Sequence, residues 1–78
     1  MSIIYDRTEL TEKQQNVYNF ISDFIDNKGY PPTIRDIMKE FGFKSTNSPR
    51  VHLGAMAEKG FIEVHDKIAR GIKLLKKG

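Results

Sequence analysis

The polar run 45–51 contains the side chains best equipped to recognise another molecule. Asn47 carries an amide that can pair with the edge of an adenine, and Arg50 carries a guanidinium that can pair with guanine. Each well-seated pair of this kind contributes about 1–3 kcal/mol of discrimination between bases. Ser45 and Ser48 add hydroxyls that can cap a helix or bond a phosphate. These residue types, so close together, indicate contact with DNA.

Each residue of the run also has a less specific interpretation. Asn47 could belong to a capping loop, and Arg50 could clamp a phosphate instead of a base. Thr46 and Val51 are candidates for contact with thymine methyl groups, and Thr46 equally for contact with the DNA backbone. Sequence around the run is needed to choose between these roles.

Two short helices joined by a glycine are predicted to position the run. The first begins at Thr33 and ends near Phe41, and its apolar residues follow a helical spacing: Ile34, Ile37, Met38 and Phe41. Gly42 supplies the positive φ for a change of direction, and Phe43 is predicted to fill the corner. The second helix turns Leu53, Met56 and Ala57 inward and stops at Gly60. This pattern is typical of a helix-turn-helix.

The start of that second helix has two alternatives. Ser45 could cap it, or Ser48 could cap it with Pro49 at the first helical position. The second choice has the better local chemistry, because the residue before a proline avoids helical angles. In either case Pro49 is expected within the first turn, where a missing N–H costs least.

A longer helix is predicted before this pair and a β-hairpin after it. Thr11 and Gln14 form a capping box for a helix from Glu12 to Lys28, which Gly29 ends. Residues 61–65 and 72–75 alternate as two strands, connected by residues 66–71. Three helices and a two-stranded antiparallel wing make a mostly helical winged helix-turn-helix.

Length and composition exclude several other classes. Seventy-eight residues without cysteine make one domain with neither a disulfide framework nor a thiolate metal site. No apolar run is long enough to cross a membrane, so a cytoplasmic location is expected. His52 and His65 lack the spacing of a zinc site, and no carboxylate near Ser48 and His52 completes a catalytic set. We expect no cofactor, no metal and no catalysis.

The net charge of +3 is divided unevenly along the chain. Residues 1–41 hold five Lys/Arg against seven Asp/Glu, whereas residues 42–78 hold eight against three. A basic half beside a helix-turn-helix favours a surface that faces phosphates, although a merely solvated basic surface has the same composition. The expected contacts to the DNA backbone are Lys44, Lys67, Arg70 and Lys73, with Arg70 also placed to enter the minor groove. Ile68 is expected to pack beneath the hairpin, with contact to a sugar or a second protomer as the alternatives.

Residues 10–75 resemble the N-terminal DNA-binding domain of the LexA family, repressors of the bacterial DNA-damage (SOS) response. The matching pieces occur in order: Leu10-Thr11, Gln14-Gln15, residues 29–33, Arg35-Asp36-Ile37, residues 42–45, His52-Leu53, residues 59–62 and Arg70-Gly71-Ile72. The resemblance implies a third helix in the major groove and a wing on the adjoining backbone. It also implies a sequence-specific regulator of transcription, acting as a repressor by excluding polymerase from an operator.

Two departures from the family pattern matter. LexA repressors carry a C-terminal domain that dimerises and cleaves its own linker, and nothing here corresponds to it. The chain is therefore expected to be an excised domain or a free-standing relative, such as a phage or plasmid regulator. Residues 48–51 also differ from family patterns, so the operator is not carried over from the resemblance.

The chain divides into a lead of residues 1–9, the domain of residues 10–75 and a basic tail of residues 76–78. Tight binding is expected to need two copies on half-sites about 34 Å apart. Ile3, Ile4 and Tyr5 in the lead are candidates for the surface that pairs them as a homodimer. The alternative function is a protein-interaction module that docks on a host repressor or RNA polymerase without reading bases.

Overall fold

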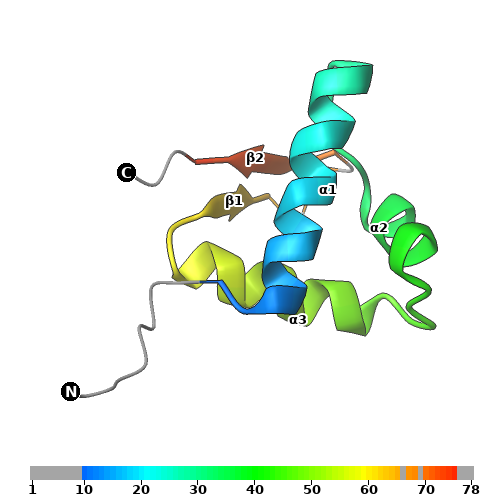
Figure 1. Cartoon of the computed structure of the whole chain (residues 1–78), viewed down its shortest axis with the longest axis vertical. Coiled ribbons are helices and arrows are strands. Elements are labelled where there is room, and N and C mark those ends of the chain that lie inside the picture. Colours follow the sequence, from blue (N-terminus) through cyan, green and yellow to red (C-terminus); the bar gives the residue numbers. More distant parts are fainter. Residues whose placement is uncertain (1–9, 66, 69, 76–78) are drawn as a thin grey trace.

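The computed structural model describes residues 10–65, 67–68 and 70–75 as three helices followed by a two-stranded antiparallel hairpin. The elements are α1 (Glu12–Lys28), α2 (Ile34–Phe41), α3 (Asn47–Glu58), β1 (Ile62–Val64) and β2 (Ile72–Leu74). Helix α3 crosses the end of α1, with α2 on one side of this pair and the hairpin on the other (Figure 1). This confirms the predicted fold class. The predicted lead 1–9 and tail 76–78 lie outside the described residues.

Helix α1 begins and ends where its local chemistry predicts. The amide of Gln14 donates to the Thr11 hydroxyl at 3.2 Å, and the Thr11 amide donates to Gln14 Oε1 at 3.1 Å. Two of the otherwise unpaired donors of the first turn are thereby satisfied. Gly29 ends the helix with a φ of 85°, and its amide donates to the Ile25 carbonyl. Both predicted boundaries are confirmed.

Helix α2 repeats this design in eight residues. The carboxylate of Asp36 accepts from the Thr33 amide at 2.9 Å, and the Asp36 amide donates to the Thr33 hydroxyl at 3.1 Å. Gly42 closes the helix with a φ of 71°. A short helix depends on such end contacts and on tertiary packing, because its own hydrogen bonds do not offset the free-energy cost of helix nucleation.

The capping role of Asp36 predicts a pH dependence of stability. The Thr33 amide that donates to the carboxylate lowers the pKa of Asp36, partial burial opposes this effect, and Arg70 adds to the lowering. A carboxyl whose pKa is lowered by folding stabilises the folded state fully above its pKa in the unfolded chain, about 3.9 for aspartate. This stabilisation is lost as the pH falls through the pKa of the same carboxyl in the folded chain. In urea unfolding at pH 6, Asp36→Asn is expected to have a lower free energy of unfolding than the unchanged chain. This difference is expected to disappear as the pH is lowered to 2. A difference that is constant across this range would contradict the role.

Helix α3 starts at neither of the predicted serines. Its first helical residue is Asn47, and Thr46 is the N-cap, without a side-chain capping bond. The Arg50 amide donates to the Thr46 carbonyl at 3.3 Å, so Ser48 lies inside the helix although a proline follows it. The expectation that Pro49 lies in the first turn is confirmed. Because Pro49 is fully buried, its packing outweighs the local preference that favoured a later start.

The hairpin has three-residue strands in the register Ile62↔Leu74, Glu63↔Lys73 and Val64↔Ile72. These strands are shorter than predicted, although backbone bonds extend the pairing at both ends. The predicted alternation is present, with Ile62 buried and Glu63 exposed. The predicted connection includes Asp66 and Ala69, which lie outside the described residues.

One hydrophobic core joins all five elements. Its fully or almost fully buried members are Val17, Ile21, Ile37, Leu53, Met56, Ile62 and Ile72. The corner between α2 and α3 is filled as predicted by Phe43, whose ring stacks on Phe41 at 5.9 Å and on His52 at 5.7 Å between centroids. This packing fixes α3 on the other helices through one face and leaves its opposite face unpacked. In the described part of the chain, no helix is long and apolar enough to cross a membrane.

Candidate nucleic-acid interface

Helix α3 has a buried face and an exposed face, and most of the polar run lies on the exposed one. Pro49, Leu53 and Met56 are buried at the spacing of one helical face. Asn47 and Arg50 are exposed, with Val51 beside them. The first turns of α3 therefore present hydrogen-bonding groups to the outside of the molecule.

The structure brings most of the sequence-predicted base-contact residues together at this end of α3. Ser45 is exposed just before the helix, and the exposed fraction of Val51 is 62%. Ser48 is half-buried, because it precedes the buried Pro49 in the first turn. Lys44 and Thr46 are exposed at the entrance to the helix. Among the described residues, Arg50 has no ion-pair or hydrogen-bond partner for its side chain, which leaves the guanidinium free for a ligand.

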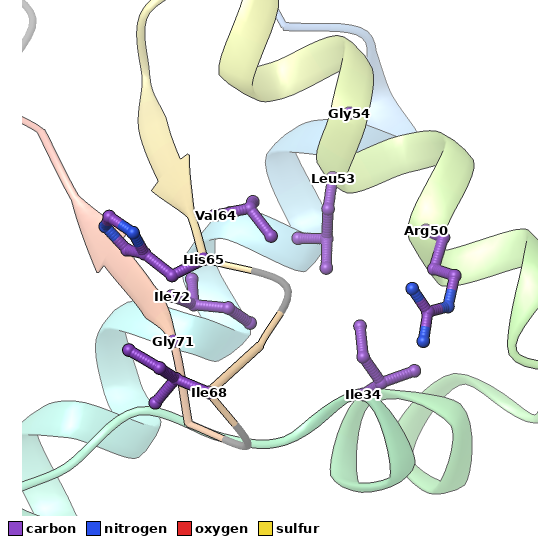
Figure 2. Close-up of a pocket in the computed structure, with 9 residues that line it drawn as sticks. All are labelled: Ile34, Arg50, Leu53, Gly54, Val64, His65, Ile68, Gly71 and Ile72. Carbon is purple, nitrogen blue, oxygen red and sulfur yellow. The ribbon is translucent and has the colours of Figure 1, made fainter.

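A hollow of about 300 Å³ lies between α3, the start of α2 and the wing. Arg50 and Ile34 lie on one side of it and His65 and Gly71 on the other (Figure 2). The remaining lining residues are Leu53, Gly54, Val64, Ile68 and Ile72. The hollow thus has an apolar floor and a cation at its edge, and two exposed residues of α3, Arg50 and Gly54, are part of its lining.

The wing places Lys67 and Lys73 at the surface as expected, but Ile68 differs from its predicted packing. Ile68 is 60% exposed and lines the hollow, so the expectation that it packs beneath the hairpin is wrong. Its amide donates to the His65 carbonyl, and the Gly71 amide donates to the Ile68 carbonyl. This tight turn points the Ile68 side chain away from the core.

Arg70, the fourth predicted backbone contact, lies against the start of α2. Its guanidinium donates to the Pro31 carbonyl at 2.8 Å and lies 3.5 Å from the Asp36 carboxylate. It also stands 4.4 Å from the centroid of the Tyr30 ring. Sequence reasoning missed this contact, because no local pattern pairs residues 39 positions apart.

Each histidine contacts a residue near it in the sequence. The ring of His52 stacks on Phe43, and His65 lies exposed with Nε2 at 3.2 Å from the Glu63 carboxylate. Among the residues that the structure describes, no group of three or more His, Asp or Glu side chains is placed to hold a metal ion.

Gly54 provides a stability prediction on the exposed face of α3. A Cβ added there would meet nothing within 4 Å, and glycine in a helix interior costs about 0.8–1.0 kcal/mol relative to alanine. Gly54→Ala is therefore expected to raise the free energy of unfolding by up to about 1 kcal/mol in urea titrations. Gly29→Ala is the matched control, since a φ of 85° strains any residue with a Cβ, and it is expected to lower stability. A loss of stability with Gly54→Ala would contradict the open environment of this residue.

Three helices, a hairpin wing and an exposed polar start to the third helix define a winged helix-turn-helix. The chain belongs to the LexA DNA-binding domain family, whose sequence model matches residues 7–71.

Named relatives show the same similarity over most of this chain. The LexA repressor of Actinobacillus succinogenes is 47% identical over 66 residues, which are 85% of this chain and 31% of that repressor. The LexA repressor of Haemophilus ducreyi is 45% identical over 69 residues, 88% of this chain and 33% of the relative. The LexA repressor of Cupriavidus metallidurans is 49% identical over 65 residues, 83% and 30% of the two chains. The chain thus spans about a third of the length of these relatives.

Proposed function

We propose that this chain binds duplex DNA in a sequence-specific manner and represses transcription. Its family is named as a DNA-binding domain, and its relatives are named as repressors. The observation that carries the proposal is the exposed polar start of α3, which stands opposite a fully buried helical face and beside a basic wing. Such a helix can enter the major groove, about 12 Å wide, without unfolding any part of the core. The protein acts in the bacterial cytoplasm on the chromosome or on an invading replicon.

Base recognition is assigned to the exposed side chains of the run. The amide of Asn47 pairs with adenine N6 and N7, and the guanidinium of Arg50 pairs with guanine O6 and N7. The hydroxyls of Ser45 and Ser48 bond base edges or phosphates, and Val51 contacts a thymine methyl group. The partial burial of Ser48 makes it the least accessible of the five.

Backbone contacts are assigned to basic and hydroxyl side chains at the entrance to α3 and on the wing. Lys44 and Thr46 approach phosphates at the entrance to α3, while Lys67 and Lys73 do so from the wing. One DNA strand follows the hollow between α3 and the wing, where the exposed Ile68 packs on a sugar. Arg70 contributes from the wing as well, by a phosphate contact or by the contacts with α2 described above.

Repression follows from occupancy of an operator that polymerase must use. One domain offers few contacts, so tight binding needs two copies on half-sites about one helical turn apart. Homodimerisation through the lead residues 1–9 is one route to this pairing, and sedimentation with and without these residues tests it. A chain that remains monomeric at high concentration in both forms would exclude the lead as a dimer surface.

The test of DNA binding is selection from a library of randomised duplexes, followed by titration of the enriched sequence. We expect a defined consensus, bound more tightly than a scrambled duplex of the same composition. Between 50 and 200 mM salt, affinity is expected to fall about 40- to 150-fold for three or four phosphate contacts. Arg50→Ala is expected to relax the choice of base at one position. An unenriched library and an affinity that does not change with salt would contradict the proposal.

The second candidate function is a protein-interaction module for a host repressor or RNA polymerase. The observation that favours it is the exposure of two branched apolar side chains, Val51 at 62% and Ile68 at 60%. Such a module would bind repressor or polymerase in pull-down and titration experiments and would show no affinity for duplex DNA. The basic charge of the wing and of the α3 entrance favours DNA.

A further inference from the structure

Arg70 connects the wing to a part of the chain distant in sequence. Its guanidinium contacts Tyr30 and Pro31 in the segment before α2 and Asp36 in the first turn of α2. These are a hydrogen bond of 2.8 Å, an ion pair of 3.5 Å and a cation–π contact of 4.4 Å. Three different interactions on one side chain indicate a defined position for the guanidinium and not a chance approach.

The residues that Arg70 contacts, Tyr30 and Asp36, are held in place by other interactions. The Tyr30 ring packs edge-on against Phe24 of α1 at 5.9 Å between centroids. The Asp36 carboxylate is fixed by its capping bond to the Thr33 amide at 2.9 Å. Arg70 therefore binds to a preformed site made of Tyr30, Pro31 and Asp36, which we call the seat of Arg70. Because this site is preformed, less side-chain entropy is lost when the contact forms.

The chemistry of the seat requires a guanidinium. A planar, weakly hydrated cation can lie over an aromatic ring while its edge donates to a carbonyl and a carboxylate. A lysine ammonium would keep the charge but lose this combined geometry. A phosphate contact, by contrast, accepts lysine as a point charge.

The wing needs such a support because its two strands have only three residues each. A two-stranded hairpin is at best marginally stable by itself. Ile62 and Ile72 attach the strands to the core, whereas the turn beyond them carries the exposed Lys67 and Ile68. The contact of Arg70 with the start of α2 lies at this turn end of the wing.

We propose that Arg70 is a positioning residue: held by Tyr30, Pro31 and Asp36, it fixes the wing at a set distance from the helix-turn-helix. The inference rests on the proposed binding of DNA, which α3 and the wing must contact together across the hollow. Arg70 then acts on affinity through the placement of the wing, and its charge is directed to Asp36 and not to a phosphate. Ile34, at the start of the same helix α2, lines the hollow whose width this contact sets.

Titration of the selected duplex distinguishes positioning from direct contact with a phosphate. Arg70→Lys and Tyr30→Leu are each expected to weaken binding about 3- to 10-fold, and the double variant no more than the stronger single one. Tyr30→Phe keeps the ring and is expected to stay within about twofold of the unchanged chain. An effect of Arg70→Lys or of Tyr30→Leu below twofold, or full additivity of the two, would overturn the proposal.

A measurement on the free chain separates this inference from the proposed function. In proton NMR spectra, the Arg70 side-chain protons next to the guanidinium are expected upfield of their usual positions, because the guanidinium carbon lies 4.4 Å from the centroid of the Tyr30 ring. Tyr30→Leu should return them to ordinary values and shift the amide signals of Gly71 and Ile72. Ordinary Arg70 shifts in the unchanged chain would refute the contact whether or not DNA binds. Upfield shifts in a chain that binds no duplex would refute the proposed function and, with it, the role of the contact in DNA binding.

Discussion

Asn47→Ala is expected to weaken binding to the selected duplex by about 5- to 150-fold, which corresponds to 1–3 kcal/mol. Asn47 is the first residue of α3 and is exposed, so its amide can reach a base edge without any movement of the core. Because the side chain is uncharged, affinity for scrambled DNA and the dependence on salt concentration should stay unchanged. Fluorescence anisotropy with both duplexes measures these quantities.

A base substitution at the adenine that Asn47 contacts completes this test. This base substitution should weaken binding of the unchanged chain by the same factor as Asn47→Ala does on the selected duplex. The Asn47→Ala variant should bind the two duplexes equally well. Asn27→Ala is the matched control, since Asn27 is an exposed asparagine in the last turn of α1, far from the start of α3 (Figure 1). Equal losses on selected and scrambled DNA would assign Asn47 to the backbone or to helix capping instead.

Ile37→Ala is expected to have the largest effect on folding, a loss of about 2–5 kcal/mol in the free energy of unfolding. Ile37 is the buried residue of the short helix α2, with no exposed surface, and it packs in the core shared with α1, α3 and the wing. Removing three carbon atoms there loses both transfer free energy and contacts around the new cavity. For a domain of this size the expected loss is a large share of the total stability.

Urea unfolding followed by circular dichroism measures this loss. Val51→Ala is the control, because Val51 is 62% exposed on α3, and it is expected to change stability by less than about 0.5 kcal/mol. If Ile37→Ala cost no more than Val51→Ala, α2 would not be packed as the structure has it.

Where short-range chemistry decides an element, the sequence was sufficient to predict it. Thr11 with Gln14, and Thr33 with Asp36, satisfy unpaired amides within three residues, so the starts of α1 and α2 were predictable. Gly29 and Gly42 end these helices with positive φ values, which other residues rarely adopt. The apolar spacing in between then identified the buried faces.

Where packing between distant segments determines the start of an element or the position of a side chain, the sequence was not sufficient to predict it. The start of α3 depends on the burial of Pro49, and local proline rules favoured a different start. Ile68 is exposed because the wing turn directs it away from the core, although its branched apolar side chain suggested that it would be packed. The seat of Arg70 requires the folded chain, because no periodicity relates the wing to the start of α2.

The candidate site was predictable as a surface and not as a set of contacts. Polar residues at the start of a helix whose later residues are apolar must face outward once the core forms, and Asn47 and Arg50 do so. The hollow beside them depends on the distance between α3 and the wing, which only the structure gives. The variants described above test the individual roles of these side chains at the DNA.

In the proposed function, the exposed start of α3 and the facing wing together form the DNA-binding surface. The most direct test is a titration of the isotopically labelled chain with the selected duplex, followed through its backbone amide signals. We predict the largest changes at residues 44–54 and at the wing around Lys67, Ile68 and Lys73, with little change along the middle of α1. Changes concentrated on α1, with the α3 and wing signals unmoved, would contradict the account.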